Sequence, residues 1–254
     1  MSSVFDCRDE AQILPGMRHA RQAIARGELV VLPTDTVYGL AADAFSPAAV
    51  QKLLDAKGRG REMPPPVLVA GPETLAALAE QVPQAVHDLV ARFWPGGLTI
   101  VLPAQPSLAW DLGETKGTVA VRMPDNRIAL ELLSETGPLA VSSANLTGSS
   151  AALNAAEAEA MLGASVAVYL ENGYTDNGVP STIIDATSLT DGSPIPTVRV
   201  LREGAVAHDQ LAEVLGELLE PLDDDSVADA AADAASGTAE AHSAASGERP
   251  DGTE

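Results

Sequence analysis

Three basic side chains gather in one short stretch of the sequence, AKGRGRE, where Lys57, Arg59 and Arg61 alternate with glycine. Ammonium and guanidinium groups form strong charge-assisted hydrogen bonds with phosphate oxygens. The chain contains neither G-x-x-x-x-G-K-[ST] nor G-x-G-x-x-G, so a bound nucleotide would depend on basic side chains rather than on a glycine-rich backbone cradle. The simpler interpretation is a helix end, because a lysine in the last turn and a following glycine are typical there.

Hydroxyl and amide side chains border three runs that resemble strands. Thr36 belongs to PTDT after the apolar run ELVVLP, Ser143 and Asn145 end PLAVSSAN, and Ser181 follows Pro180 in GVPSTIIDAT. Ligands of open α/β sheets lie at such strand ends. The same residue types also form turns by bonding their own backbone, so both interpretations stand at this point.

Arg122 lies in the alternating run TVAVRMP. A strand would place Val119 and Val121 on one face and Thr118 and Arg122 on the other. The guanidinium then faces either solvent or a cleft that supplies a carboxylate or phosphate partner.

Other kinds of chemistry find little support in the sequence. The four histidines, His19, His87, His208 and His242, show no metal-ligand spacing. The single cysteine, Cys7, excludes an intramolecular disulfide and a cysteine-based zinc site. No G-x-S-x-G motif marks a serine nucleophile.

The composition points to an acidic globular protein. The 254 residues are 46% hydrophobic and carry a formal net charge of −21. This negative charge argues against a protein that binds nucleic acid over its whole surface. No apolar run reaches the roughly 18 residues of a membrane-spanning helix, and MSSVFDCRDE lacks the pattern of a signal peptide. We therefore expect a cytoplasmic protein with no membrane contact.

Short β-branched runs alternate with helical patterns along most of the chain. Strands are expected at residues 28–33, 66–71, 98–103, 118–124, 138–143, 165–171, 181–187 and 197–203. Helices are expected at residues 16–27, 46–58, 72–81, 83–93, 125–137 and 155–162. Because several strands follow one another after residue 165, we predict an α/β (α+β-like) domain with a twisted mixed sheet flanked by helices.

Six segments, in this order, resemble signatures of the threonylcarbamoyl-AMP synthase family, also called the YrdC or Sua5 family: PTDTVYGLAADA, AKGRGRE, WPGGLTIVLP, VAVRMPDNRIALELL, GPLAVSSANLTG and GVPSTIIDAT. The resemblance implies a single YrdC-like catalytic domain, residues 10–206, with a large concave cleft. Residues 1–9 would then form an N-terminal arm and residues 207–221 a C-terminal helix. Residues 222–254, acidic and rich in alanine and serine, are expected to be disordered.

The resemblance also implies a reaction. Family members are nucleotidyltransferases that join L-threonine, bicarbonate and ATP into L-threonylcarbamoyladenylate and release pyrophosphate, with Mg²⁺ expected on the ATP. Downstream proteins transfer the product to adenosine 37 of tRNA as N6-threonylcarbamoyladenosine, and a weak direct contact with tRNA is expected. Two alternatives are a non-catalytic module that binds double-stranded RNA or tRNA, and carbamoyl-adenylate chemistry with another acceptor.

Residue roles follow from the same motifs. The resemblance assigns threonine binding to Thr36, Tyr38, Arg122 and Ser181. It assigns ATP binding to Lys57, Arg59, Thr118, Ser143, Asn145 and Arg202, and it implies no protein metal site. One loop departs from the family pattern, because Met63-Pro64-Pro65-Pro66 stands where many members have Asn-Pro-Leu and then a histidine.

Overall fold

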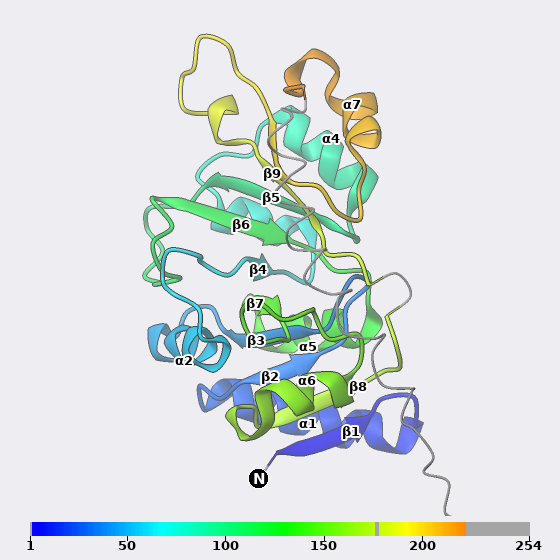
Figure 1. The fold of residues 1–254 in the computed structure, drawn as a ribbon. Coiled ribbons are helices and arrows are strands. Elements are labelled where there is room, and N and C mark those ends of the chain that lie inside the picture. Colours follow the sequence, from blue (N-terminus) through cyan, green and yellow to red (C-terminus); the bar gives the residue numbers. More distant parts are fainter. Residues whose placement is uncertain (1, 176–177, 222–254) are drawn as a thin grey trace, which may run out of the picture.

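In the computed structural model, which describes residues 2–175 and 178–221, ten strands form one mixed sheet in the order β1-β8-β2-β3-β7-β4-β6-β5-β9-β10. The strands are β1 Ser3–Asp6, β2 Val30–Leu32, β3 Gly39–Asp43, β4 Val67–Leu68, β5 Leu98–Pro103, β6 Thr118–Arg122, β7 Leu139–Ser143, β8 Val168–Glu171, β9 Thr182–Asp185 and β10 Arg199–Arg202. Figure 1 shows the labelled strands stacked from β1, beside the N-terminus, through β7, β4 and β6 to β5 and β9. The predicted mixed α/β fold is confirmed.

Helices cover this sheet. They are α1 Glu10–Ala25, α2 Pro47–Lys57, α3 Leu75–Leu78, α4 Gln84–Phe93, α5 Arg127–Thr136, α6 Ala155–Leu162 and α7 His208–Leu215. Short 3₁₀ turns occur at η1 Pro72–Thr74, η2 Gly163–Ser165, η3 Thr187–Leu189 and η4 Gly216–Leu218. None of the helices in the described ranges is long and apolar enough to cross a membrane.

The central strands are apolar on both faces, which is why helices lie on both sides. In β2, Val30 and Leu32 pack with α1 and α5, whereas Val31 between them packs with α2 and α6. Period-two alternation makes neighbouring residues face opposite ways. A further core fills the space between the strands around β5 and helices α3, α4 and α7.

Helix α2 begins and ends where the sequence predicted. The Ser46 hydroxyl accepts a hydrogen bond from the Ala49 amide at 3.3 Å, and Pro47 occupies the first turn. Gly58 ends the helix in the left-handed conformation at φ 62°, which costs glycine no Cβ clash. These caps fix where the basic loop AKGRGRE leaves the helix.

The N-terminal residues belong to the sheet. Strand β1 pairs in parallel with β8, Ser3 opposite Val168, and Cys7 is buried at 3% exposure in the core under α1. Helix α1 starts at Glu10, earlier than the expected residue 16, and carries Pro15 inside it. The predicted tail, residues 222–254, lies outside the described residues.

Candidate active site

A cleft of about 1100 Å³ opens beside the middle of the sheet. Its walls come from the loops before β3 and after α2, from β6, and from the ends of β7, β9 and β10. Nearly all of the predicted site residues line it: Thr36, Tyr38, Arg59, Thr118, Arg122, Ser143, Asn145, Ser181 and Arg202. Segments more than 160 residues apart in sequence, from Thr36 to Arg202, therefore meet at one cavity.

Arg122 is the most enclosed charge of the cleft, at 6% exposure. Its Nη2 forms an ion pair with Asp35 Oδ1 at 2.6 Å, and its Nη1 donates to Thr36 Oγ1 at 2.9 Å. The Nε atom donates to the Gly96 carbonyl at 2.9 Å. A guanidinium has five N–H groups, so these three bonds leave two for a ligand. Burial lowers the pKa of Arg122 and the nearby Asp35 opposes that change.

The PTDT segment forms the turn between β2 and β3. The Thr34 hydroxyl donates to the Val37 carbonyl at 2.7 Å and accepts from the Thr36 amide at 3.1 Å. The turn brings both the Thr36 hydroxyl and the Asp35 carboxylate into contact with Arg122. Asp35 does not line the cleft; its Oδ1 also accepts from the Asp125 amide at 2.9 Å.

Lys57 is the one predicted residue that does not line the cleft. It is 3% exposed, and its Nζ donates to the Ser143 carbonyl at 2.6 Å, the Asn145 carbonyl at 2.7 Å and Asn145 Oδ1 at 3.0 Å. Burial, and then the charge of Arg59, lowers its pKa to about 8. The lysine therefore holds the loop after β7 in place. Arg59 reaches the same strand end from the cleft side, because its Nη1 donates to Ser142 Oγ at 2.9 Å.

Ser181 links two strands and an arginine. Its hydroxyl shares a 2.9 Å hydrogen bond with the buried Thr99 hydroxyl of β5. Arg202 donates through Nη2 and Nε to the Ser181 carbonyl, at 2.7 and 3.2 Å. The Arg202 guanidinium is thereby aligned along the β9 edge of the cleft.

Tyr38 is fully buried and crosses from the β3 turn to the segment after β8. Its hydroxyl donates to the Gly173 carbonyl at 2.8 Å and accepts from the Asn172 amide at 2.8 Å. Burial raises its pKa above the usual tyrosine range. Tyr38 is among the residues that line the cleft, but its side chain belongs to the core and its hydroxyl is bound by backbone groups.

The cleft also holds residues that sequence reasoning did not select. Acidic and basic groups among them are Glu62, Glu114, Lys116, Asp185, Arg199 and Glu203. Asp35 was visible in PTDT, but nothing in that segment indicates a pairing with an arginine 87 positions later. The triple proline Pro64-Pro65-Pro66 also lines the cleft.

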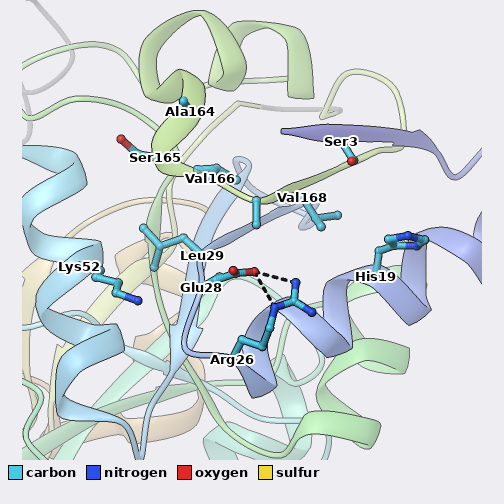
Figure 2. A pocket seen from close by; sticks show the side chains of 11 residues that line it. Ser3, His19, Arg26, Glu28, Leu29, Lys52, Ala164, Ser165, Val166 and Val168 are labelled. Atoms are coloured by element: carbon cyan, nitrogen blue, oxygen red, sulfur yellow. Dashed lines mark hydrogen bonds and ion pairs between the residues drawn. The ribbon is translucent and has the colours of Figure 1, made fainter. Parts of the chain in front are cut away.

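A second, smaller hollow of about 400 Å³ lies between α1, α2 and the starts of β2 and β8. Figure 2 shows Arg26 of this hollow paired with Glu28, an ion pair of 2.7 Å. Lys52 Nζ donates to the Gly27 carbonyl at 2.8 Å. None of the predicted site residues lines this hollow, so the large cleft is the candidate active site.

Together, the mixed sheet and a cleft rich in hydroxyl and basic side chains define an α/β protein able to hold a ligand of nucleotide size. The Sua5/YciO/YrdC family model, described as "Telomere recombination", matches residues 22–204. The chain belongs to this family.

Relatives and solved structures agree with that assignment. A Mycobacterium tuberculosis protein, provisionally named as a threonylcarbamoyl-AMP synthase, is 48% identical over 216 residues, which cover 85% of this chain and 96% of the relative. The threonylcarbamoyl-AMP synthase of Pyrococcus abyssi is 38% identical over 204 residues, 80% of this chain and 58% of the longer archaeal protein. The crystal structure of P. abyssi Sua5 complexed with L-threonine superposes with a TM-score of 0.75 at 34% identity, covering 87% of this chain and 63% of that one.

Proposed function

We propose that this chain is an L-threonylcarbamoyladenylate synthase, a nucleotidyltransferase that forms threonylcarbamoyl-AMP and pyrophosphate from L-threonine, bicarbonate and ATP. The observation that carries the proposal is the single cleft in which hydroxyl and basic side chains from six separate motifs meet. Relatives that share the fold along most of this chain bear the corresponding name.

The reaction needs no protein nucleophile. The threonine amine adds to bicarbonate-derived CO₂ and loses a proton, which gives a carbamate. A carbamate oxygen then forms a bond to the α-phosphorus of ATP while the bond from that phosphorus to the bridging oxygen breaks and pyrophosphate leaves. Alignment of the two substrates and neutralisation of the phosphate charge supply the catalysis. The described cleft residues include no cysteine, and covalent chemistry is not required.

The threonine end of the cleft lies at Arg122. Its two remaining N–H groups would hold the carboxylate, and Thr36, with its hydroxyl 2.9 Å from Nη1, lies beside that position. Ser181 and Tyr38 would contact the rest of the amino acid. A methyl group alone distinguishes threonine from serine by only about 1–3 kcal/mol, so hydroxyl partners such as Ser181 would contribute to selection against valine.

The nucleotide end lies toward the loop after β7. Arg59 would contact the phosphates directly, and Lys57 would act on the nucleotide through the loop that carries Ser143 and Asn145. Thr118 and Arg202 line the remaining walls and would contact the nucleoside.

We expect Mg²⁺ to enter with ATP. Among the described residues no group of three or more histidine, cysteine, aspartate or glutamate side chains could hold a metal ion. The chemistry of the cleft fits a metal carried by phosphate oxygens, which commonly bring Mg²⁺ into nucleotide sites, and the metal would neutralise the triphosphate there. The proposed place of action is the cytoplasm, where downstream proteins would use the product on tRNA.

Pyrophosphate release tests the function directly. Release from ATP should require both L-threonine and bicarbonate, and mass spectrometry should detect threonylcarbamoyl-AMP. Arg59→Ala should weaken ATP use by about 1.5–3 kcal/mol, the scale of charge-assisted hydrogen bonds. Pyrophosphate release that ignores threonine would overturn the proposal.

A further inference from the structure

The turn that joins β5 to β6 contains an unusual backbone position at Lys116. Among residues 2–175 and 178–221 it is the one non-glycine residue with positive φ, at 52°. A side chain there crowds the backbone, whereas glycine and asparagine adopt this conformation readily. The next residue, Gly117, is also left-handed at φ 81°, and its carbonyl accepts from the Ala104 amide at 2.9 Å. The turn therefore holds Lys116 in a backbone conformation that glycine or asparagine would adopt more readily.

The side chain of Lys116 has the position and the charge that binding an anionic ligand requires. It is exposed and lines the large cleft. Within the part of the chain that the structure describes, it makes no hydrogen bond or ion pair. Glu62 and Glu114 line the same cleft and would repel a polyphosphate, and a cation in that cleft offsets the repulsion.

Backbone contacts bring the Lys116 turn to the loop that carries Arg59. The Glu114 amide donates to the Arg61 carbonyl at 2.8 Å, and Arg61 Nη2 pairs with Asp111 at 2.6 Å. The approach is close, because a Cβ added at Gly113 would come within 2.7 Å of that same carbonyl. Lys116 and Arg59 each lie two residues from this junction, and both line the cleft.

We propose that Lys116 binds the β- and γ-phosphates of ATP, and the pyrophosphate that leaves, together with Arg59. The proposal rests on the proposed function for the identity of the nucleotide. It explains why a lysine occupies a left-handed turn position in a chain with only three lysines: the charge is needed at the cleft despite the backbone cost.

The substitution Lys116→Asn removes the charge and keeps the turn, because asparagine tolerates the left-handed conformation. We expect the affinities for ATP and for pyrophosphate, measured by calorimetry, to fall about 10- to 100-fold, the effect of losing a charge-assisted bond. The affinity for AMP should change less than threefold, and the unfolding temperature should not fall. Lys116→Arg should retain most of the ATP affinity.

Lys52→Gln is the matched control, because Lys52 is exposed on α2 and lies at the other hollow; it should bind ATP like the wild type. Wild-type ATP affinity in Lys116→Asn, or an equal loss for ATP and AMP, would overturn the assignment. A wild-type protein that binds ATP through Lys116 but forms no threonylcarbamoyl-AMP would instead contradict the proposed function and leave this inference standing.

Discussion

The guanidinium of Arg122 is nearly buried and stays charged because it forms an ion pair with Asp35 at 2.6 Å. Removing one member of a buried ion pair leaves the other uncompensated. Since Asp35 does not line the cleft, we propose that it acts by positioning the guanidinium whose remaining N–H groups would hold the threonine carboxylate.

Asp35→Asn should therefore act on threonine. The amide keeps an oxygen near Nη2 but loses the charge, so the guanidinium is less firmly aligned. We expect the KM for threonine to rise about tenfold, or about 1.4 kcal/mol, with a smaller change in the KM for ATP. Steady-state pyrophosphate release with each substrate varied in turn measures both.

Asp125→Asn provides the control, because the Asp125 side chain is exposed and only its backbone amide bonds to Asp35. Its KM for threonine should match the wild type. Equal increases of both KM values in Asp35→Asn would indicate general damage to the cleft rather than positioning of Arg122.

Lys57 makes folding stability depend on pH in a direction that can be worked out. Burial lowers its pKa from 10.5 to about 8. Between these values the unfolded chain binds a proton that the folded chain has released, so the contribution of Lys57 to the free energy of unfolding rises with pH across this window. Below about pH 8 both states are protonated and the contribution is constant.

Lys57→Met should remove this dependence. Denaturant unfolding at several values between pH 7 and pH 10.5 gives the difference between the wild-type and variant free energies of unfolding, which should increase with pH above about 8. Lys52→Met, at an exposed position, should show no such trend relative to wild type. A difference that stays flat would mean that Lys57 keeps an ordinary pKa.

At the scale of elements, the β5–β6 loop is held to the rest of the protein by side chains near its middle. Trp110 stacks on Phe45 with ring centroids 5.6 Å apart, and Asp111 pairs with Arg61 while its Oδ1 also accepts from the Gly113 amide at 3.1 Å. The Arg61 guanidinium holds the pKa of Asp111 below its usual range. The ion pair is partly exposed, so its direct value is only about 0.2–1 kcal/mol.

Asp111→Ala should loosen this loop without unfolding the protein. We expect faster amide exchange in residues 112–117, a two- to tenfold higher KM for ATP, and a loss of about 1 kcal/mol or less in unfolding free energy. Glu135→Ala breaks another exposed pair, with Arg21 at 2.6 Å, and should leave the loop exchange unchanged. Unchanged exchange in Asp111→Ala would show that the remaining contacts, among them the Trp110 stacking and the Glu114–Arg61 backbone bond, are enough to hold the loop.

The alternation of apolar and polar residues was enough to predict the strands that have one apolar face and one polar face. Alternation in β6 put Val121 and Arg122 on opposite faces, and the structure has Val121 in the core and Arg122 at the cleft. The start of α1 was placed at residue 16, whereas the helix begins at Glu10 and carries Pro15 inside it. The partners of Lys57 were not predictable, because its three acceptors lie more than 80 residues away, and local sequence does not fix which loop closes over an ammonium group.

At the scale of the whole molecule, one continuous sheet lets distant motifs share a site. Strands β3 and β7 pair with Gly39 opposite Ser143, which brings the PTDT turn beside the SSAN segment. Strand β4 then pairs with both β7 and β6, so Arg122 lies two strands from Ser143. The cleft is therefore a consequence of strand order, and helices on both faces hold that order.

At this scale the net charge of the chain favours an enzyme over an RNA-binding module of the same fold. Non-specific affinity for nucleic acid comes mainly from Lys and Arg that neutralise phosphates, and this chain has 15 such residues against 36 acidic ones. Two of the cations that line the cleft pair with carboxylates, Arg122 with Asp35 at 2.6 Å and Arg199 with Asp185 at 3.7 Å. We expect unmodified tRNA to bind at physiological salt with a Kd no tighter than about 100 µM. Filter binding at 50 and 150 mM salt measures it, and submicromolar binding at the higher salt, without turnover of ATP, would favour the RNA-binding alternative.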